Sequence, residues 1–287
     1  MPGRNLDGYC MSIPELIVLA AAFFCVAVLY SSVGHAGASG YLAIMALMGM
    51  APVTMRPTAL ALNLVVATLA TWRFWRAGWT KWSSLWPFIA TSVPLAFVGG
   101  RVQLPVSGYR TLLGFVLVSS AAVLAWRAWG GERHLGEPQP RIPLPVALSA
   151  GVFIGALSGL TGTGGGIFLS PLLLLAGWAG PRGTAGISAP FIWANSLAGL
   201  LGVRWVSGSL PAGLPWLVVA VLAGAWIGTA FGLNRLPPRV LLWALSVVLM
   251  IAGVTELIED AWTHWSIGPV GVREAVTLVA AAGVFMV

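Results

Sequence analysis

Residues 159–171 read GLTGTGGGIFLSP and place five glycines and two threonines in the middle of apolar sequence. A counterpart, SSVGHAGASGYLA, occupies residues 31–43. Glycine-rich sequence does not readily hold a regular helix, and each unpaired amide in hydrocarbon costs several kcal/mol. Such an interruption persists only where it is buried in protein or lines a polar cavity. Two matching interruptions in the two halves of one chain therefore point to a transporter's binding site.

The composition is that of a membrane protein. Of 287 residues, 58% are hydrophobic and only 8% are charged, whereas about a quarter are charged in soluble domains. The net charge of +7 does not indicate nucleic-acid binding, because the basic residues are scattered at the ends of apolar segments. The fifteen tryptophans suit anchoring at the membrane interface, and they would also suit a homodimer interface. We expect a multi-pass protein of the plasma (inner) membrane in contact with the lipid bilayer.

The apolar runs predict eight full membrane spans, each near the 20 residues that a helix needs to cross a bilayer. They lie near 13–33, 56–75, 84–102, 108–129, 143–162, 183–205, 212–234 and 237–258. Two shorter runs, near 40–51 and 166–178, follow the glycine-rich segments and are interpreted as second halves of broken helices. A final run, 268–287, either spans the membrane or lies against the bundle.

The two halves repeat. Gly40 matches Gly166, and Thr58-Ala59 matches Thr184-Ala185, at an offset of 126 residues, while Leu104-Pro105 matches Leu236-Pro237 at 132, so the register drifts by a few residues. The predicted fold class is thus an all-α polytopic membrane protein of two inverted repeats, each of about five helical segments, with paired broken helices at the Gly-rich motifs. The predicted parts are an N-terminal repeat (13–129), a cytoplasmic linker (130–141), a C-terminal repeat (142–258), and a loop with an extra helix (259–287).

The distribution of arginine and lysine predicts the orientation. If each short segment crosses the membrane, nine basic residues fall on one side and six on the other, where Glu256 and its acidic neighbours also lie. If the short segments are re-entrant, the separation of charge is poorer. We therefore favour inverted repeats, with the N-terminus outside and the linker in the cytoplasm.

The candidate binding residues lie in the two glycine-rich segments and in the spans that follow them. They are Ser31, Ser32, His35, Gly37, Ser39, Gly40, Asn63, Thr161, Gly162, Thr163, Gly164, Gly165, Gly166, Ser188 and Asn195. A helix that starts near Gly166 would turn its backbone N–H groups and positive dipole end toward a cavity, which suits an anion. The alternative role of the glycines is close helix packing.

Four candidates have a second interpretation. Asn63 lies on a helix expected to begin after Arg56-Pro57. Asn63, Ser188 and Asn195 either donate hydrogen bonds to the substrate or to the interrupted backbone, or form hydrogen bonds that join neighbouring helices. His35 either shuttles protons or is a satisfied hydrogen-bonding side chain.

Several activities are excluded or weakened by missing residues. Lys81 lacks the glycine and hydroxyl neighbours of a phosphate-binding loop. Three histidines and two cysteines are too few and scattered for a metal site, and we expect no cofactor and no catalytic residue. Gly37-Ala38-Ser39-Gly40 has the GxSG form of rhomboid-type serine proteases, which would require a histidine that activates the serine. We keep that protease as a minor alternative.

The motifs GTGGG at 162–166, Pro171, and TAGIS at 184–188 resemble those of the TauE/SafE sulfite exporter family. The first half agrees more loosely, through GHAGASG at 34–40 and Asn63. The resemblance implies a membrane transporter that exports small sulfur oxyanions, sulfite or an organosulfonate. His35 departs from the plainer glycine run of the family and puts the choice of substrate in question.

The function that we predict is export of a small anion by a secondary transporter or facilitator, driven by the membrane potential or coupled to protons through His35. A carrier for another small solute or a cation, which would use backbone carbonyls, is the alternative. An accessory subunit without transport activity is a third.

Overall fold

The computed structural model describes residues 13–32, 34–129, 142–206, 210–211, 213–234 and 239–263. These residues form helices and connecting turns, without a strand among them. The helices are α1 (Ile13–Ser32), α2 (Ala38–Leu47), α3 (Pro52–Arg76), α4 (Trp82–Arg101), α5 (Val106–Trp129), α6 (Leu144–Thr161), α7 (Gly166–Leu175), α8 (Pro181–Val206), α9 (Leu214–Asn234) and α10 (Arg239–Thr263). The predicted linker 130–141 and the run 268–287 lie outside the described residues. The predicted division into parts stays a prediction.

Seven of these helices are long and apolar enough to cross a membrane: α1, α3, α4, α5, α6, α8 and α9. The eighth predicted span corresponds to α10, which has 25 residues. The two short runs form α2 and α7, with ten residues each. The all-α, multi-pass prediction is confirmed, and the helix ends fall within a few residues of the predicted ones for nearly every span.

The start of α3 is the clearest exception. The helix begins at Pro52, four residues before the predicted span near 56–75. Proline suits the first turn of a helix, where its missing N–H costs nothing. The prediction that this helix begins after Arg56-Pro57 is therefore wrong, and Arg56 lies inside the helix and is 8% exposed.

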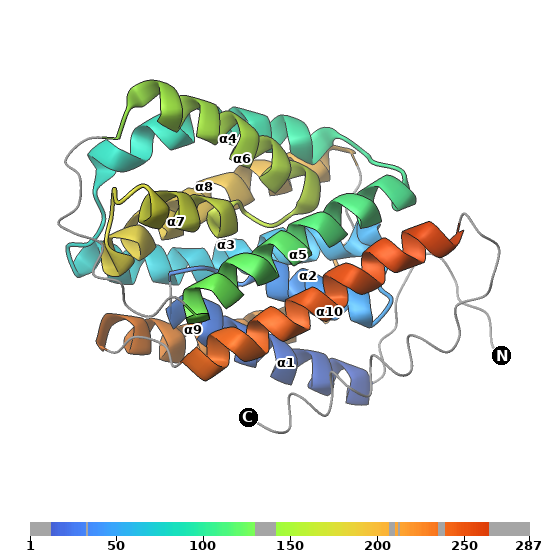
Figure 1. Cartoon of the computed structure of the whole chain (residues 1–287). Coiled ribbons are helices and arrows are strands. Elements are labelled where there is room, and N and C mark those ends of the chain that lie inside the picture. Colours follow the sequence, from blue (N-terminus) through green and yellow to red (C-terminus); the bar gives the residue numbers. More distant parts are fainter. Residues whose placement is uncertain are drawn as a thin grey trace.

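The packing of the two halves is mirrored (Figure 1). In Figure 1, α4 lies beside α6, and α1 lies beside α9. The corresponding helices α3 and α8 contact each other, as do α5 and α10. In the second pair, Gly114 meets Leu257, and Arg110 Nε lies 3.8 Å from Glu256 Oε2, so the start of α5 faces the end of α10.

The corresponding helices thus run antiparallel, as an inverted repeat requires. In α3 and α8, Asn63 bonds Ser196 and Thr68 bonds Trp193, which gives the same direction. If each half crossed the membrane an even number of times, these pairs would be parallel. We keep the inverted repeat, with the orientation predicted above, as our interpretation.

Glycines allow the mirrored pairs to approach closely. Gly155 and Gly159 of α6 lie against the backbone of Ser92 and Ala96 in α4. Gly224 of α9 lies against α1, where an added Cβ would come within 2.5 Å of the Phe24 carbonyl oxygen. Small residues at such spacing bring membrane helices together. These two closely packed helix pairs, α4 with α6 and α1 with α9, form the framework around α2 and α7.

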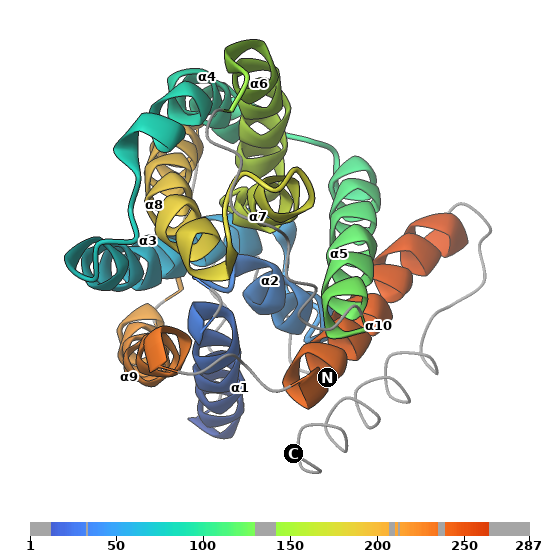
Figure 2. The same ribbon diagram turned by 60° about the vertical axis from the view of Figure 1, so that its left-hand side comes forward.

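Neither short helix continues the axis of the helix before it (Figure 2). The first turn of α2 packs on the second half of α1: Gly40 lies against Val26 and Tyr30, and the rings of Phe23 and Tyr41 are 4.8 Å apart. The glycine-rich segments therefore break the helical path as predicted, and each short helix takes a new direction after its break.

Candidate functional site

The two short helices begin at glycines with left-handed backbone. Gly37 precedes α2 with φ 98°, and Gly165 precedes α7 with φ 77°. Gly34, Gly162 and Gly164 also have positive φ. Glycine adopts this region at little cost, whereas a side chain is strained there. This requirement explains the glycines at these five positions, and neither helix start has a side-chain cap from its own N-cap residue.

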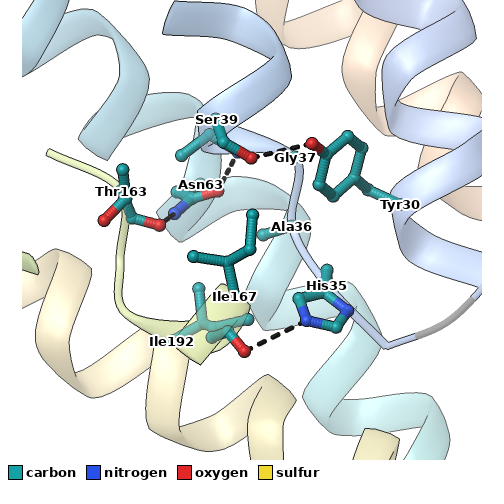
Figure 3. A pocket seen from close by; sticks show the side chains of 11 residues that line it. Tyr30, His35, Ala36, Gly37, Ser39, Asn63, Thr163, Ile167 and Ile192 are labelled. Atoms are coloured by element: carbon teal, nitrogen blue, oxygen red, sulfur yellow. Dashed lines mark hydrogen bonds between the residues drawn. The ribbon is translucent and has the colours of Figure 1, made fainter. Parts of the chain in front are cut away.

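The starts of α2 and α7 meet at one small cavity, the central hollow (Figure 3). It is lined by Tyr30, His35, Ala36, Gly37, Ala38, Ser39, Asn63, Thr163, Gly166, Ile167 and Ile192. Its volume is about 10 Å³, which is on the order of what one water molecule needs. The N-terminal ends of both short helices, and hence the positive ends of both dipoles, border the same space.

Asn63 connects the two glycine-rich segments. Its Oδ1 accepts a hydrogen bond from the Ala38 N–H at 3.0 Å, and its Nδ2 donates to the Thr163 carbonyl at 3.3 Å. The same Nδ2 lies 3.3 Å from the Ser196 hydroxyl. Asn63 is 1% exposed. Asn63 therefore bonds interrupted backbone on both sides of the central hollow, and it also joins α3 to α8 through Ser196.

His35 makes a second connection. Its Nε2 lies 3.1 Å from the Gly166 carbonyl oxygen, and since a carbonyl only accepts, Nε2 donates. Next to it, the hydroxyls of Tyr30 and Ser39 share a hydrogen bond of 2.8 Å. Figure 3 shows that these side chains and Asn63 surround the same space, with Tyr30 on α1, His35 on the segment before α2, Ser39 on α2 and Asn63 on α3.

Carbonyls and amides of the second segment differ in how they are satisfied. The Thr163 and Gly166 carbonyls accept from Asn63 and His35, and the Thr161 carbonyl accepts from Tyr109 at 3.0 Å. Within the described chain, the N–H groups of residues 163–167 meet no protein acceptor. The same holds for the N–H groups of residues 36, 37, 39 and 40 in the first segment. Buried N–H groups without a partner are rare in proteins, so the site offers unused donors.

Six of the predicted site residues line the central hollow: His35, Gly37, Ser39, Asn63, Thr163 and Gly166. The remaining glycines shape its surroundings. Gly164 faces Asn63 and Ser196, Gly165 faces Ile154 and Phe191, and Gly162 lies against Arg56. Gly40 packs on α1. These glycines support the close packing that was their alternative role.

The remaining hydroxyl and amide candidates are buried but do not line the central hollow. Ser32 donates to the Leu29 carbonyl of its own helix, and Ser188 pairs with Ser170 at 2.8 Å. Thr161 bonds Thr163. Asn195 Nδ2 donates to the Phe191 carbonyl at 2.9 Å, while its Oδ1, like Ser31 Oγ, has no partner among the described residues.

The sequence argument missed Tyr30, Ile192 and Arg56. Tyr30 sits in the last turn of α1, directly before the candidate Ser31, and Ile192 lies one turn after the candidate Ser188, so the neighbourhood of these candidates could have suggested both. Arg56 donates to the carbonyls of Val102, Gly99 and Gly159, which are distant in sequence. No local pattern could have predicted these partners.

The contacts do not assemble a protease. Ser39 pairs with Tyr30, while His35 bonds Gly166, so this histidine is not seen activating this serine. The described residues also contain no group of three or more histidine, cysteine, aspartate or glutamate side chains suited to a metal ion.

Comparison with known proteins gives two findings. Residues 19–255 match the family model described as "Sulfite exporter TauE/SafE". The chain is also similar to a protein of Sinorhizobium fredii (strain NBRC 101917 / NGR234) named "Probable membrane transporter protein y4hK", with 42% identity over 243 residues that cover 85% of this chain and 98% of that protein. No solved structure matches the chain significantly.

Proposed function

Because the chain belongs to the sulfite exporter TauE/SafE family, we propose that this multi-pass membrane transporter exports a small sulfur oxyanion, sulfite or an organosulfonate, from the cell. The substrate would bind in the central hollow, between the starts of α2 and α7. No cofactor and no chemical step are part of the proposal.

One observation carries this proposal. The carbonyls closest to the central hollow already accept hydrogen bonds from Asn63 and His35, while the N–H groups of residues 163–167 have no protein acceptor in the described structure. Three of these five residues line the hollow. Amides at a helix N-terminus bind oxyanions well, and a cation would need the carbonyls instead. The arrangement therefore favours an anion over a cation, and Ile167 and Ile192 would contact the carbon part of an organosulfonate.

The described conformation is closed. A volume of about 10 Å³ accommodates on the order of one water molecule, and sulfite has four heavy atoms. The substrate must therefore enter a wider conformation, in which α2 and α7 separate. Movement of one repeat against the other would open the site to alternate sides. An interior-negative potential would drive export by about 2.3 kcal/mol per charge per 100 mV.

The experiment is anion flux from proteoliposomes that contain the purified chain. We expect sulfite or methanesulfonate to leave loaded vesicles at a rate that follows an imposed potassium diffusion potential. Protein-free vesicles and vesicles loaded with a neutral solute are the controls. Flux of the neutral solute or of a cation in place of the anion would contradict the proposal, and a purified chain that moves no solute would favour the accessory-subunit alternative.

A further inference from the structure

Arg56 is a buried arginine that bonds only backbone. It lies on α3 and is 8% exposed. Its Nε donates to the Gly159 carbonyl at 2.9 Å, and one terminal nitrogen donates to the Val102 carbonyl at 2.9 Å. The other terminal nitrogen contacts the carbonyls of Gly99 and Gly159. The side chain therefore joins the C-terminal ends of α4 and α6 to α3.

The positive charge of Arg56 has no acidic counterpart. In the described structure no carboxylate lies within ion-pair distance of it, and the nearby Glu256 pairs with Arg110 at 3.8 Å. The negative ends of the α4 and α6 dipoles stabilise the guanidinium in part. Since arginine does not lose its proton in proteins, a full positive charge stays buried here.

This charge adjoins the second glycine-rich segment. A Cβ added to Gly162 would lie 3.0 Å from Arg56 Cγ. Thr163, one residue further, lines the central hollow. Asn63, which also lines it, follows Arg56 by two turns on the same side of α3, or about 10 Å along the helix. An anion in the central hollow would therefore lie on the order of 10 Å from the guanidinium, across buried protein.

The repeat supplies a comparison within the same molecule. Arg182 stands at the position equivalent to Arg56, at the offset of 126 residues that relates Thr58-Ala59 to Thr184-Ala185. Arg182 is exposed, and its guanidinium lies over the Trp79 ring at 5.7 Å. Of these two equivalent arginines, only one is buried beside the site.

We propose that Arg56 determines specificity, as a fixed buried charge that favours anions in the central hollow and favours dianions more than monoanions. The inference rests on the proposed function. At about 10 Å and an effective dielectric constant of about 20, removing one unit charge weakens binding of a monoanion on the order of tenfold, and of a dianion on the order of a hundredfold.

The test compares methanesulfonate, a monoanion, with sulfoacetate, a dianion at neutral pH. Dissociation constants are measured with the purified full chain for wild type, Arg56→Gln, Arg56→Lys and Arg182→Gln. Arg56→Gln is expected to weaken methanesulfonate on the order of tenfold and sulfoacetate on the order of a hundredfold. Arg56→Lys, whose ammonium can still donate to three carbonyls, and Arg182→Gln are expected to stay within about threefold of wild type for both.

A merely structural role would give a different pattern. If Arg56→Gln weakens both anions by one common factor or leaves both unchanged, the inference is wrong while the proposed function stands. If Arg56→Gln does not fold, wild type and Arg56→Lys decide: tighter binding of sulfoacetate than of methanesulfonate in both proteins supports the inference, and equal binding of the two anions in wild type overturns it. If wild type binds neither anion, the proposed function and this inference both fail.

Discussion

Two buried asparagines with different surroundings provide the most informative pair of substitutions. Asn63 is 1% exposed and bonds Ala38, Thr163 and Ser196 on other elements. Asn195 is 0% exposed, donates only to the Phe191 carbonyl one turn earlier in its own helix, and leaves its Oδ1 without a partner in the described structure. Leucine has the same heavy-atom branching as asparagine but is larger, so Asn63→Leu and Asn195→Leu remove polarity and add the same volume at both sites.

The expected effects follow from the hydrogen bonds. An interhelical hydrogen bond in a membrane protein contributes about 0.6 kcal/mol on average and up to about 1.7 kcal/mol. Three bonds then give about 2 kcal/mol for Asn63→Leu, and more because the Thr163 carbonyl and Ala38 N–H become unpaired. A buried polar group without a partner costs about 1–3 kcal/mol. Asn195→Leu removes one such group and should change stability by less than about 1 kcal/mol, in either direction.

The assay is reversible unfolding of the purified chain in mixed micelles, followed by anion flux in proteoliposomes. We expect Asn63→Leu to be destabilised and to lose flux, because the starts of α2 and α7 are no longer joined. Asn195→Leu should keep both stability and flux. Equal destabilisation by the two substitutions, or greater destabilisation by Asn195→Leu, would refute the assignment of Asn63 as the connection between the two segments.

Four further substitutions test three separate parts of the account. Gly164→Ala and Gly177→Ala both place alanine at positive φ, at a cost of about 1–2 kcal/mol. Gly164 faces Asn63, whereas Gly177 faces open space. Anion flux should therefore be lost in Gly164→Ala alone, and equal flux in the two variants would contradict this. His35→Gln keeps a donor for the Gly166 carbonyl, so voltage-driven flux should persist and should not depend on a pH gradient. Flux that follows the pH gradient in wild type but not in the variant would instead support proton coupling through His35. Ser39→Ala removes only the bond to Tyr30 and should retain flux, whereas reaction of a serine-directed label at Ser39 would support the protease alternative.

The helices were predictable because apolar length is a strong local signal. Each predicted span corresponds to an observed helix, and the glycine-rich segments interrupt helices at Gly37 and Gly165 as their composition predicts. The matching segments also predicted that the starts of two short helices share one site. The central hollow now gives that prediction a geometry, although its role in binding stays a proposal.

The partners of the buried polar groups were not predictable. Arg56 was expected just before the start of its helix, and nothing in the neighbouring sequence indicated its partners. Its partners, the carbonyls of Gly99, Val102 and Gly159, lie 43 to 103 residues away, and only packing brings them together. Ser188 faced the same difficulty, because its bond to Ser170 depends on how α7 packs on α8.

The most direct test locates a bound anion by its own scattering. Selenite has the shape and charge of sulfite, and selenium gives an anomalous signal in crystals of the protein soaked or grown with it. The account predicts an anomalous peak between the start of α2, near Ala38, and the start of α7, near Gly166. An anomalous peak only at exposed arginines such as Arg182, with no peak between these two helix starts, would contradict it.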